Sequence, residues 1–215
     1  MVPANSPLLN LSVSESIQSA PDMATINTGV QTRAMTAKDA MAQNATQMDK
    51  LINALVKAGI ARKDIQTSGI NLNPQYDYAN RPEGQGPRFT GYEASNQLTV
   101  KIRKIGTAGD LVDALVSAGA TNINGPTFGI AEPDKLIDQA RTKALQTAQT
   151  RANLYAQATG FKRVRLVSIS EGGGYSPPMP VMAMRDMAAA APQTKIEPGE
   201  VSTSISLTVQ YMLEP

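Results

Sequence analysis

The clearest pattern in the chain is Val201-Ser202-Thr203-Ser204-Ile205-Ser206-Leu207-Thr208-Val209-Gln210-Tyr211-Met212-Leu213, in which apolar residues alternate with hydroxyl and amide residues. A repeat of two places one set of side chains on a core face and the other in water, which predicts an amphipathic strand. The same alternation occurs at residues 9–17, 24–34 and 98–102. Strands with one polar face are typical of antiparallel sheets, so we expect a mostly antiparallel sheet.

Helical spacing replaces this alternation in three places. The first predicted helix begins at the capping-box sequence Thr36-Ala37-Lys38-Asp39, in which a hydroxyl and a carboxylate can bind free amides. Its predicted apolar stripe ends before Gly59, where a left-handed cap is expected, and consists of Met41, Ala45, Met48, Ile52 and Leu55.

The second predicted helix follows a similar cap signal, Thr107-Ala108-Gly109-Asp110, and carries Leu111 and Leu115 before Gly119. The third begins at Pro133, a residue favoured in the first turn, and ends before Gly160. It carries a stripe that consists mostly of alanine, which permits close approach to a neighbour: Ile137, Ala140, Ala144, Ala148, Ala152 and Tyr155.

Two segments echo each other, Leu51-Ile52-Asn53-Ala54-Leu55-Val56-Lys57-Ala58-Gly59 and Leu111-Val112-Asp113-Ala114-Leu115-Val116-Ser117-Ala118-Gly119. Duplication and common helix chemistry both explain the echo. Each segment lies between predicted strands, so residues 23–131 run strand, helix, strand, strand, helix, strand. This order predicts an α+β fold with a ferredoxin-like βαββαβ element. We expect one domain over residues 1–215, with an extra N-terminal strand and a C-terminal strand that rejoins the same sheet.

The composition excludes several classes of function. The 215 residues contain no cysteine and no histidine, which removes thiol nucleophiles, Ser-His-Asp triads and structural zinc sites. The net charge is +2 and there is no tryptophan, so we expect no nucleic-acid partner. Acidic residues are scattered and no motif isolates a pair, so we predict no catalytic residues and no cofactor, although an envelope hydrolase with two facing carboxylates stays open.

The segment 172–198 is a long loop rich in glycine, proline, methionine and alanine. A loop of this length inside a domain usually has a function or is disordered. Its methionines Met179, Met182, Met184 and Met187 are soft thioethers that could bind Cu(I), although methionine more often packs against apolar surfaces or is oxidised. We therefore predict no metal site, and keep these four residues as the copper candidates.

A second small cluster, Lys162, Arg163 and Arg165, lies on a predicted strand. We interpret it as a charged strand edge that discourages aggregation, with contact to anionic lipid or lipopolysaccharide as the alternative. Gly172-Gly173-Gly174 lacks the Lys-Ser/Thr of a phosphate-binding loop and is interpreted as a flexible exit into the long loop.

Motifs along nearly the whole chain resemble the SIMPL-domain family, which includes bacterial periplasmic and outer-membrane immunogenic proteins. The matching stretches occur in the family's order: Pro21–Ile26, Gly29–Thr32, Gly59-Ile60, Asp64–Ser68, Leu72–Tyr76, Gly91–Asn96, Gly119–Thr121, Phe128, Ala140-Arg141 with Ala144, and Ile196–Glu200. We interpret Pro21-Asp22 as a turn, Asp64 as an acceptor of backbone amides, and Tyr92 and Asn96 as buried or bridging strand residues.

The resemblance implies a secreted envelope protein, periplasmic or associated with the outer membrane, with no established enzymatic activity. It also implies homo-oligomers, ring- or channel-like in some relatives, and a link to oxidative-stress defence. The chain shows no secretory leader and no apolar run of about 20 residues, so we expect export with a leader absent from this chain. Strand edges, the alanine-rich helix and the Met/Pro loop are the expected interfaces. The alternative is a periplasmic module that binds a ligand, lipid or metal through its Met-rich loop.

Overall fold

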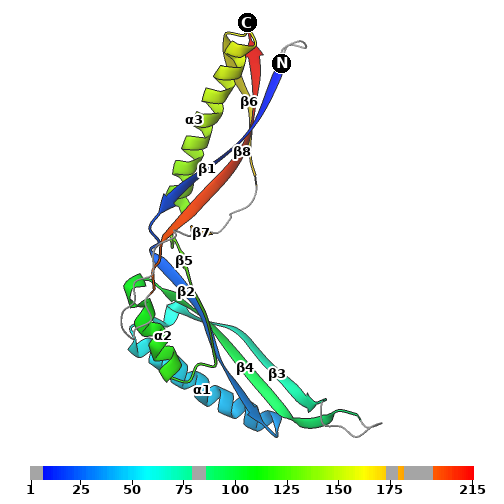
Figure 1. Ribbon diagram of the computed structural model, residues 1–215, viewed down its shortest axis with the longest axis vertical. Coiled ribbons are helices and arrows are strands. Elements are labelled where there is room, and N and C mark those ends of the chain that lie inside the picture. Colours follow the sequence, from blue (N-terminus) through cyan, green and yellow to red (C-terminus); the bar gives the residue numbers. More distant parts are fainter. Residues whose placement is uncertain (1–6, 79–85, 173–178, 182–195) are drawn as a thin grey trace, which may run out of the picture. The chain divides into compact units, whose positions relative to one another are not determined.

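The computed structural model describes residues 7–78, 86–172, 179–181 and 196–215. The chain divides into two compact units (Figure 1). The central unit comprises residues 22–128 and 185–198, and the terminal unit comprises residues 1–21, 129–184 and 199–215. Both units combine antiparallel strands with helices, so the predicted α+β class is confirmed.

The central unit contains the predicted βαββαβ element. Its strands and helices follow one another as β2 (Met23–Ala34), α1 (Ala37–Lys57), β3 (Ile65–Asp77), β4 (Arg88–Ile102), α2 (Ala108–Ser117) and β5 (Asn122–Gly129). In the sheet their order is β3-β4-β2-β5, with β4 antiparallel to both β2 and β3. This is the strand order of a ferredoxin-like sheet, in which each helix crosses over one intervening strand.

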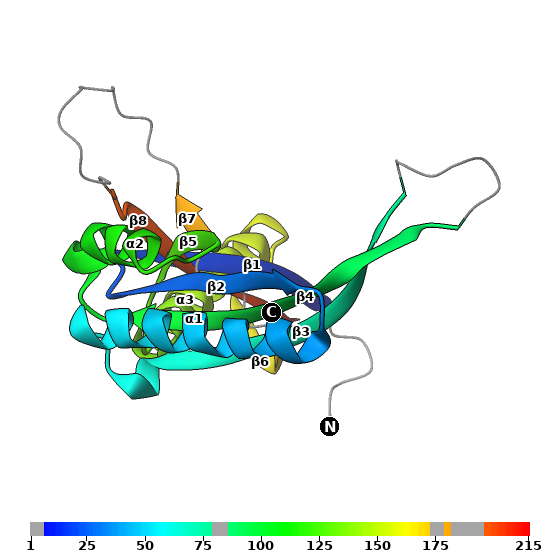
Figure 2. The same cartoon turned by 90° about the horizontal axis from the view of Figure 1, so that it is seen from below.

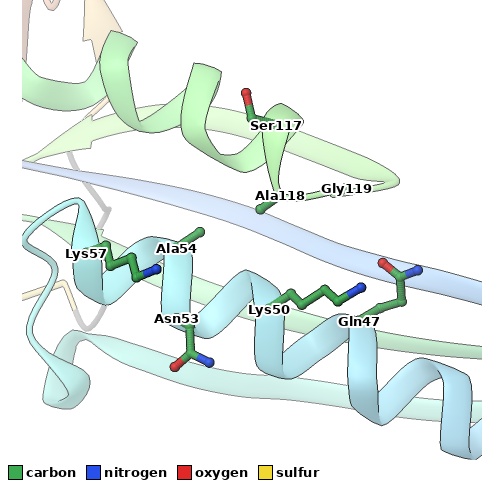
Figure 3. Close-up of a pocket in the computed structure, with 8 residues that line it drawn as sticks. All are labelled: Gln47, Lys50, Asn53, Ala54, Lys57, Ser117, Ala118 and Gly119. Carbon is green, nitrogen blue, oxygen red and sulfur yellow. The ribbon is translucent and has the colours of Figure 1, made fainter.

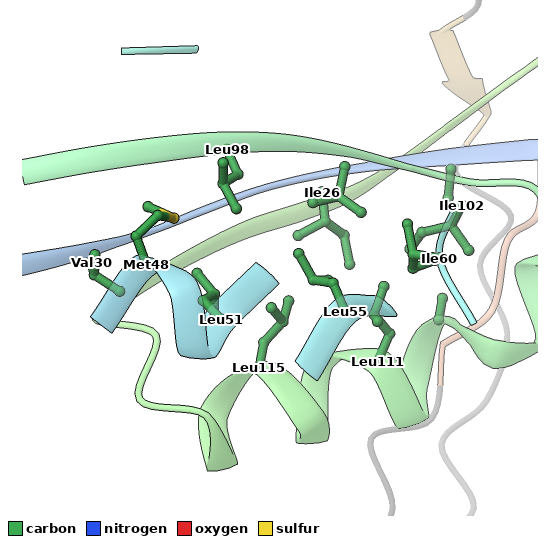
Figure 4. Packing of buried hydrophobic residues seen from close by; sticks show 13 residues of the cluster. Ile26, Val30, Met48, Leu51, Leu55, Ile60, Leu98, Ile102, Leu111 and Leu115 are labelled. Atoms are coloured by element: carbon green, nitrogen blue, oxygen red, sulfur yellow. The ribbon is translucent and has the colours of Figure 1, made fainter. Parts of the chain in front are cut away.

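The core of the central unit lies between this sheet and its two helices (Figure 4). Leu51 and Leu55 of α1 and Leu111 and Leu115 of α2 are buried against strand residues such as Ile26. The predicted stripe of α2 is thus confirmed. The first half of the predicted stripe of α1 is wrong, because Ala45 is exposed and Met41 only half-buried, whereas Ala40 and Asn44 are buried.

The two echoed segments end their helices with the same cap. In α1 the amides of Ala58, Gly59 and Ile60 donate to the carbonyls of Ala54, Val56 and Leu55, and in α2 the corresponding amides of residues 118–120 make the same three bonds. Gly59 has φ 90° and Gly119 φ 88°, a left-handed conformation that favours glycine. The echo therefore encodes two equivalent helix ends that bury equivalent leucines.

The two helix starts differ. At α1 the Thr36 hydroxyl accepts from the Asp39 amide at 3.1 Å and donates to the Asp39 carboxylate at 2.7 Å, which confirms the predicted cap. The predicted cap at α2 is wrong, because the Thr107 hydroxyl donates to the Lys104 carbonyl at 2.8 Å and makes no cap bond. A 3-10 turn at Ile105–Thr107 precedes α2, and the Thr107 hydroxyl bonds within this turn instead of capping the helix.

The terminal unit contains a second sheet. β8 (Glu200–Glu214) pairs antiparallel with β1 (Leu8–Ser19) on one side, and with β6 (Arg163–Glu171) and the short β7 (Met179–Val181) on the other. The expectation that the C-terminal strand rejoins the ferredoxin-like sheet is wrong. Alternation in the sequence identifies a strand and its buried face, but it does not identify a partner almost 200 residues away.

Helix α3 (Asp134–Ala158) covers the second sheet. Pro133 stands at its N-cap, one residue before the helix, and the residues that face the sheet are Ala140, Ala144, Ala148, Ala152 and Ala156. Tyr155, predicted on this stripe, is exposed. The alanine seam packs against the chain's own β1 and β8, and the expectation that the alanine-rich helix supplies a subunit interface stays a prediction for its outer face.

Pro21-Asp22 lies between β1 and β2, as predicted for a turn, but the two strands belong to different units. None of the helices formed by the described residues is long and apolar enough to cross a membrane.

Candidate interaction surfaces

The β3/β4 hairpin carries an apolar surface that is exposed. It consists of alternate residues of β3 and its continuation, together with one residue of β4, and we call it the hairpin patch: Ile70, Leu72, Tyr76, Tyr78 and Phe89. Leu72 lies opposite Ala94, which is fully buried, so the patch continues the face of the sheet that carries the core. Helix α1 packs mainly on β2 and β4, which leaves this face of β3 uncovered by it. Figure 2 shows the tip of the hairpin running on past the first turn of α1.

Aromatic contacts hold the far part of the patch in place. The ring of Phe89 lies edge-on to Tyr76, with centroids 5.7 Å apart, and edge-on to Tyr92, with centroids 5.3 Å apart. Such perpendicular pairs are favourable beyond the area they bury. Tyr92 is half-buried, in agreement with its predicted bridging role. The hairpin therefore presents an ordered apolar surface.

A polar groove lies between α1 and the end of α2 (Figure 3). It has a volume of about 540 Å³ and is lined by Gln47, Lys50, Asn53, Ala54, Lys57, Ser117, Ala118 and Gly119. No carboxylate lines it, and neither Lys50 nor Lys57 forms an ion pair with any residue that the structure describes. The groove is open, and its chemistry suits an anion.

A buried polar anchor, Asn44, was missed in the sequence. Its side-chain amide donates to the carbonyl of Val30 at 3.2 Å and to that of Ala94 at 3.0 Å, which ties α1 to β2 and β4. The signal was its position, one helical turn after Ala40 and one before Met48. Asn96, predicted as buried or bridging, is half-buried on β4, and its side-chain oxygen has no partner among the described residues.

Asp64 is buried beside β3, and its carboxylate binds a side chain. Arg103 donates to it through Nε at 3.2 Å and through Nη2 at 2.9 Å. The prediction that Asp64 accepts backbone amides is therefore wrong. The Arg103 guanidinium lowers the pKa of Asp64 below its usual range, so the carboxyl stays ionised.

Two carboxylates of the terminal unit are also paired with cations. Glu15 of β1 binds Lys143 of α3 at 3.0 Å, and Glu171 of β6 binds Arg141 of α3 at 2.7 Å. Hydrogen bonds from Lys143 and Arg141 lower the pKa values of Glu15 and Glu171. A general acid needs a raised pKa, and among the described residues no carboxyl group with a shifted pKa is shifted upward.

Arg163 and Arg165 of the predicted basic cluster lie on β6, an edge strand, and Lys162 lies one residue before it. Arg165 binds Glu214 at 3.1 Å and donates to the sulfur of Met212 at 3.2 Å. Met182, Met184 and Met187, with most of the loop 172–198, lie outside the described residues, as does the side chain of Met179. The copper hypothesis for these methionines therefore stays a prediction.

Comparison with known proteins gives a consistent result. Residues 9–211 match the family model described as SIMPL, protein of unknown function (DUF541). The chain is 36% identical over 200 residues to the 26 kDa periplasmic immunogenic protein of Brucella melitensis, covering 91% of this chain and 80% of that protein. It is 29% identical over 202 residues to the uncharacterized protein YggE of Escherichia coli K12, covering 93% and 80%. The matches extend through both units.

Proposed function

This chain belongs to the SIMPL family, and we propose that it is a non-enzymatic protein of the periplasm that works as a homo-oligomer. The location rests on the similarity to a Brucella protein whose name places it in the periplasm. The lack of enzymatic activity is supported by the absence of cysteine and histidine and by the downward pKa shifts of the paired carboxyls.

The observation that carries the oligomer is the hairpin patch. Monomeric proteins rarely expose large contiguous apolar surfaces, because burying such a surface against a partner lowers the free energy. Ile70 is 57% exposed and Tyr78 65%, and the patch continues the core face of the sheet. A second copy that covers this face would complete the packing that α1 leaves open.

The experiment is the solution mass measured by light scattering on a sizing column. We expect the chain to elute above its monomer mass of 22.8 kDa and a variant with Ile70→Ser and Leu72→Ser to form a smaller assembly. The matched control is Val116→Ser, which removes an equally exposed apolar side chain from α2. A monomeric parent chain would overturn the proposal, and an unchanged mass of the double variant would exclude the hairpin patch as the contact.

A link to oxidative-stress defence, an outer-membrane association and a ring- or channel-like assembly belong to the same proposal and rest on the family resemblance. Deletion of the protein should then lower survival in hydrogen peroxide, and the Ile70→Ser, Leu72→Ser variant should fail to restore it. Survival equal to that of the parent strain would remove the stress role while leaving the assembly untouched.

The polar groove favours a second candidate function, the binding of a small anionic ligand. Two lysines that have no carboxylate partner among the described residues, together with the amides of Gln47 and Asn53, offer donors to an anion. Inorganic phosphate titrated into the labelled protein should shift amide resonances around residues 47–57. Lys50→Gln with Lys57→Gln should abolish these shifts, whereas Lys38→Gln, an exposed lysine near the start of the same helix, should preserve them.

A further inference from the structure

The outer edge of the second sheet is formed by β6. In the order β1-β8-β6 it is the last strand, and no described residue pairs with its outer side. Eight of its nine residues, all except Val164, are exposed. An edge strand presents unpaired N–H and C=O groups, which is a ready template for pairing with another strand.

The middle of this edge lacks the usual protection. Proteins block exposed edges with charges, proline or very short strands, yet residues 166–170 contain no charge and no proline. Leu166 is 48% exposed and Ile169 47%. The charges of β6 stand towards its ends, where Arg165 is bound to Glu214 and Glu171 to Arg141. These ion pairs lie within the chain, so the charges of Arg165 and Glu171 already have partners.

A register shift determines which side chains share a face. Leu166 pairs with Tyr211 and Ile169 with Val209, and the ladder shifts between Leu166 and Ser168. Tyr211 and Val209 belong to the core beneath α3, so Leu166 and Ile169 lie on the α3 side of the sheet. Leu145 of α3 is also partly exposed. It lies one helical turn after Arg141, the residue that binds Glu171 of β6. The edge therefore carries an apolar strip on one face.

We propose that β6 pairs antiparallel with the β6 of a second copy of this chain, about a twofold axis between Val167 and Ser168. In this register Leu166 lies opposite the second copy's Ile169 on the same face, and the reverse pair forms by symmetry. Arg165 lies opposite the second copy's Ser170, and Val164 opposite Glu171, so no like charges face each other. The inference rests on the proposed self-assembly and names one surface and one geometry for it.

A second copy fits this edge because the pattern is complementary to itself. A hydrogen-bonded continuation would join the two sheets in the order β1-β8-β6-β6-β8-β1, and the apolar strips beside the two α3 helices would meet at the axis. The contact is separate from the hairpin patch, so the two surfaces together would permit assemblies larger than a dimer.

Cysteine pairs test the register directly, because the natural chain contains no cysteine. The test uses four single variants: Leu166→Cys, Ile169→Cys, Arg165→Cys and Ser170→Cys. Each is oxidised alone. The position-166 variant is also oxidised in a mixture with the position-169 variant, and the position-165 variant with the position-170 variant. Adjacent pairs alternate between close and wide spacing, so one mixture at least meets the distance limit of a disulfide. We expect a covalent dimer in a mixture and not in any single variant. Absence of the dimer from both mixtures, or equal yields from single variants, would overturn the register.

A charge variant tests the contact itself. Leu166→Lys with Ile169→Lys should reduce the solution mass at least twofold, whereas Ser204→Lys with Thr208→Lys, exposed positions on the opposite face of β8, should leave it unchanged. Circular dichroism checks that both variants fold. A monomeric parent chain would overturn both this inference and the proposed function. An oligomeric parent whose mass is insensitive to the β6 lysines and whose mixtures give no disulfide would overturn the edge pairing alone.

Discussion

The two units bury their sheets with different side chains. In the central unit two helices insert leucines, and residues such as Leu51, Leu55 and Leu115 are fully buried. In the terminal unit the buried residues of the one long helix are alanines, from Ala140 to Ala156, and apart from Ile137 the larger apolar side chains come from the strands. The same kind of sheet is thus covered by large residues on helices in one unit and by small residues on a helix in the other.

This difference predicts opposite sensitivities to side-chain size. A leucine that fills space leaves a cavity when it is truncated, whereas an alanine at a close helix–sheet contact leaves no room for a larger residue. The difference also explains why helical spacing in the sequence predicted the buried face of α3 better than that of α1. Helical spacing identified every buried residue of α3 except the last, which is Ala156 rather than Tyr155. For the first half of α1 it predicted the wrong face, because Ala40 and Asn44 are the buried residues there.

Truncation in the central unit should have the largest effect. Leu55→Ala should lower the free energy of unfolding by about 2–5 kcal/mol, because it opens a cavity between α1 and the sheet. Hydrogen-exchange mass spectrometry should show the loss of protection in peptides of residues 22–128. Val116→Ala, on the exposed face of α2, serves as the control. Equal losses from the two variants would contradict the observed core.

Enlargement in the terminal unit should come next. Ala148→Leu should cost about 1–3 kcal/mol, because the methyl group of Ala148 is fully buried against the sheet. The loss of protection should appear in peptides of β1, α3 and β8. Gln149→Leu, the exposed neighbour on α3, adds the same side chain without the clash. If Ala148→Leu left exchange unaltered, the close approach of α3 to its sheet would be refuted.

The Asp64–Arg103 pair should make the central unit sensitive to acid. Because the pKa of Asp64 is lowered in the folded state, its stabilising contribution is complete above the usual carboxyl pKa of about 4 and is lost as the pH falls through the lower, folded-state value. At pH 7 Asp64→Asn should cost roughly 1–2 kcal/mol, since Arg103 is half exposed. Urea titrations should show the gap between parent and variant shrinking below about pH 4. A gap that is constant with pH would contradict the pairing.

Loss of the Lys143–Glu15 pair should have the smallest effect. Lys143 is well exposed, and exposed pairs contribute little because water screens them and ordering the side chains costs entropy. Lys143→Met should leave the urea midpoint within experimental error and make the unfolding less dependent on salt. A shift as large as that of Ala148→Leu would show that this ion pair, rather than the alanine seam, holds α3 on its sheet.

Much of the central unit could be predicted from the sequence because its signals are local. The strands around Ile26 and Leu98 and the leucines of α2 were placed correctly, since alternation and helical spacing report which face of an element is buried. The cap at Thr107 was wrong because a 3-10 turn competed for its hydroxyl. Asn44 was missed because a polar residue in a core is revealed only by the carbonyls that it binds.

The candidate surfaces were less predictable. The hairpin patch was not foreseen, although Ile70, Leu72 and Tyr76 alternate, because alternation does not show that α1 packs on β2 and β4 and leaves β3 exposed. The groove joins residues 47–57 with residues 117–119, which are far apart in the sequence. Edge strands were expected as interfaces, and the basic cluster suggested a strand edge, but only the structure shows that β6 ends the sheet and that its apolar centre is exposed.

By itself the sequence determined the family, the α+β class, the strand and helix order and the lack of cysteine and histidine chemistry, because these depend on composition, motif and local period. Only the tertiary structure decided that β8 joins β1 and β6 in a second sheet, that the alanines face inward and that no described residue covers the hairpin patch or the β6 edge. These features depend on which distant segments meet, and that is set by the packing free energy of the whole chain rather than by the preference of any one segment.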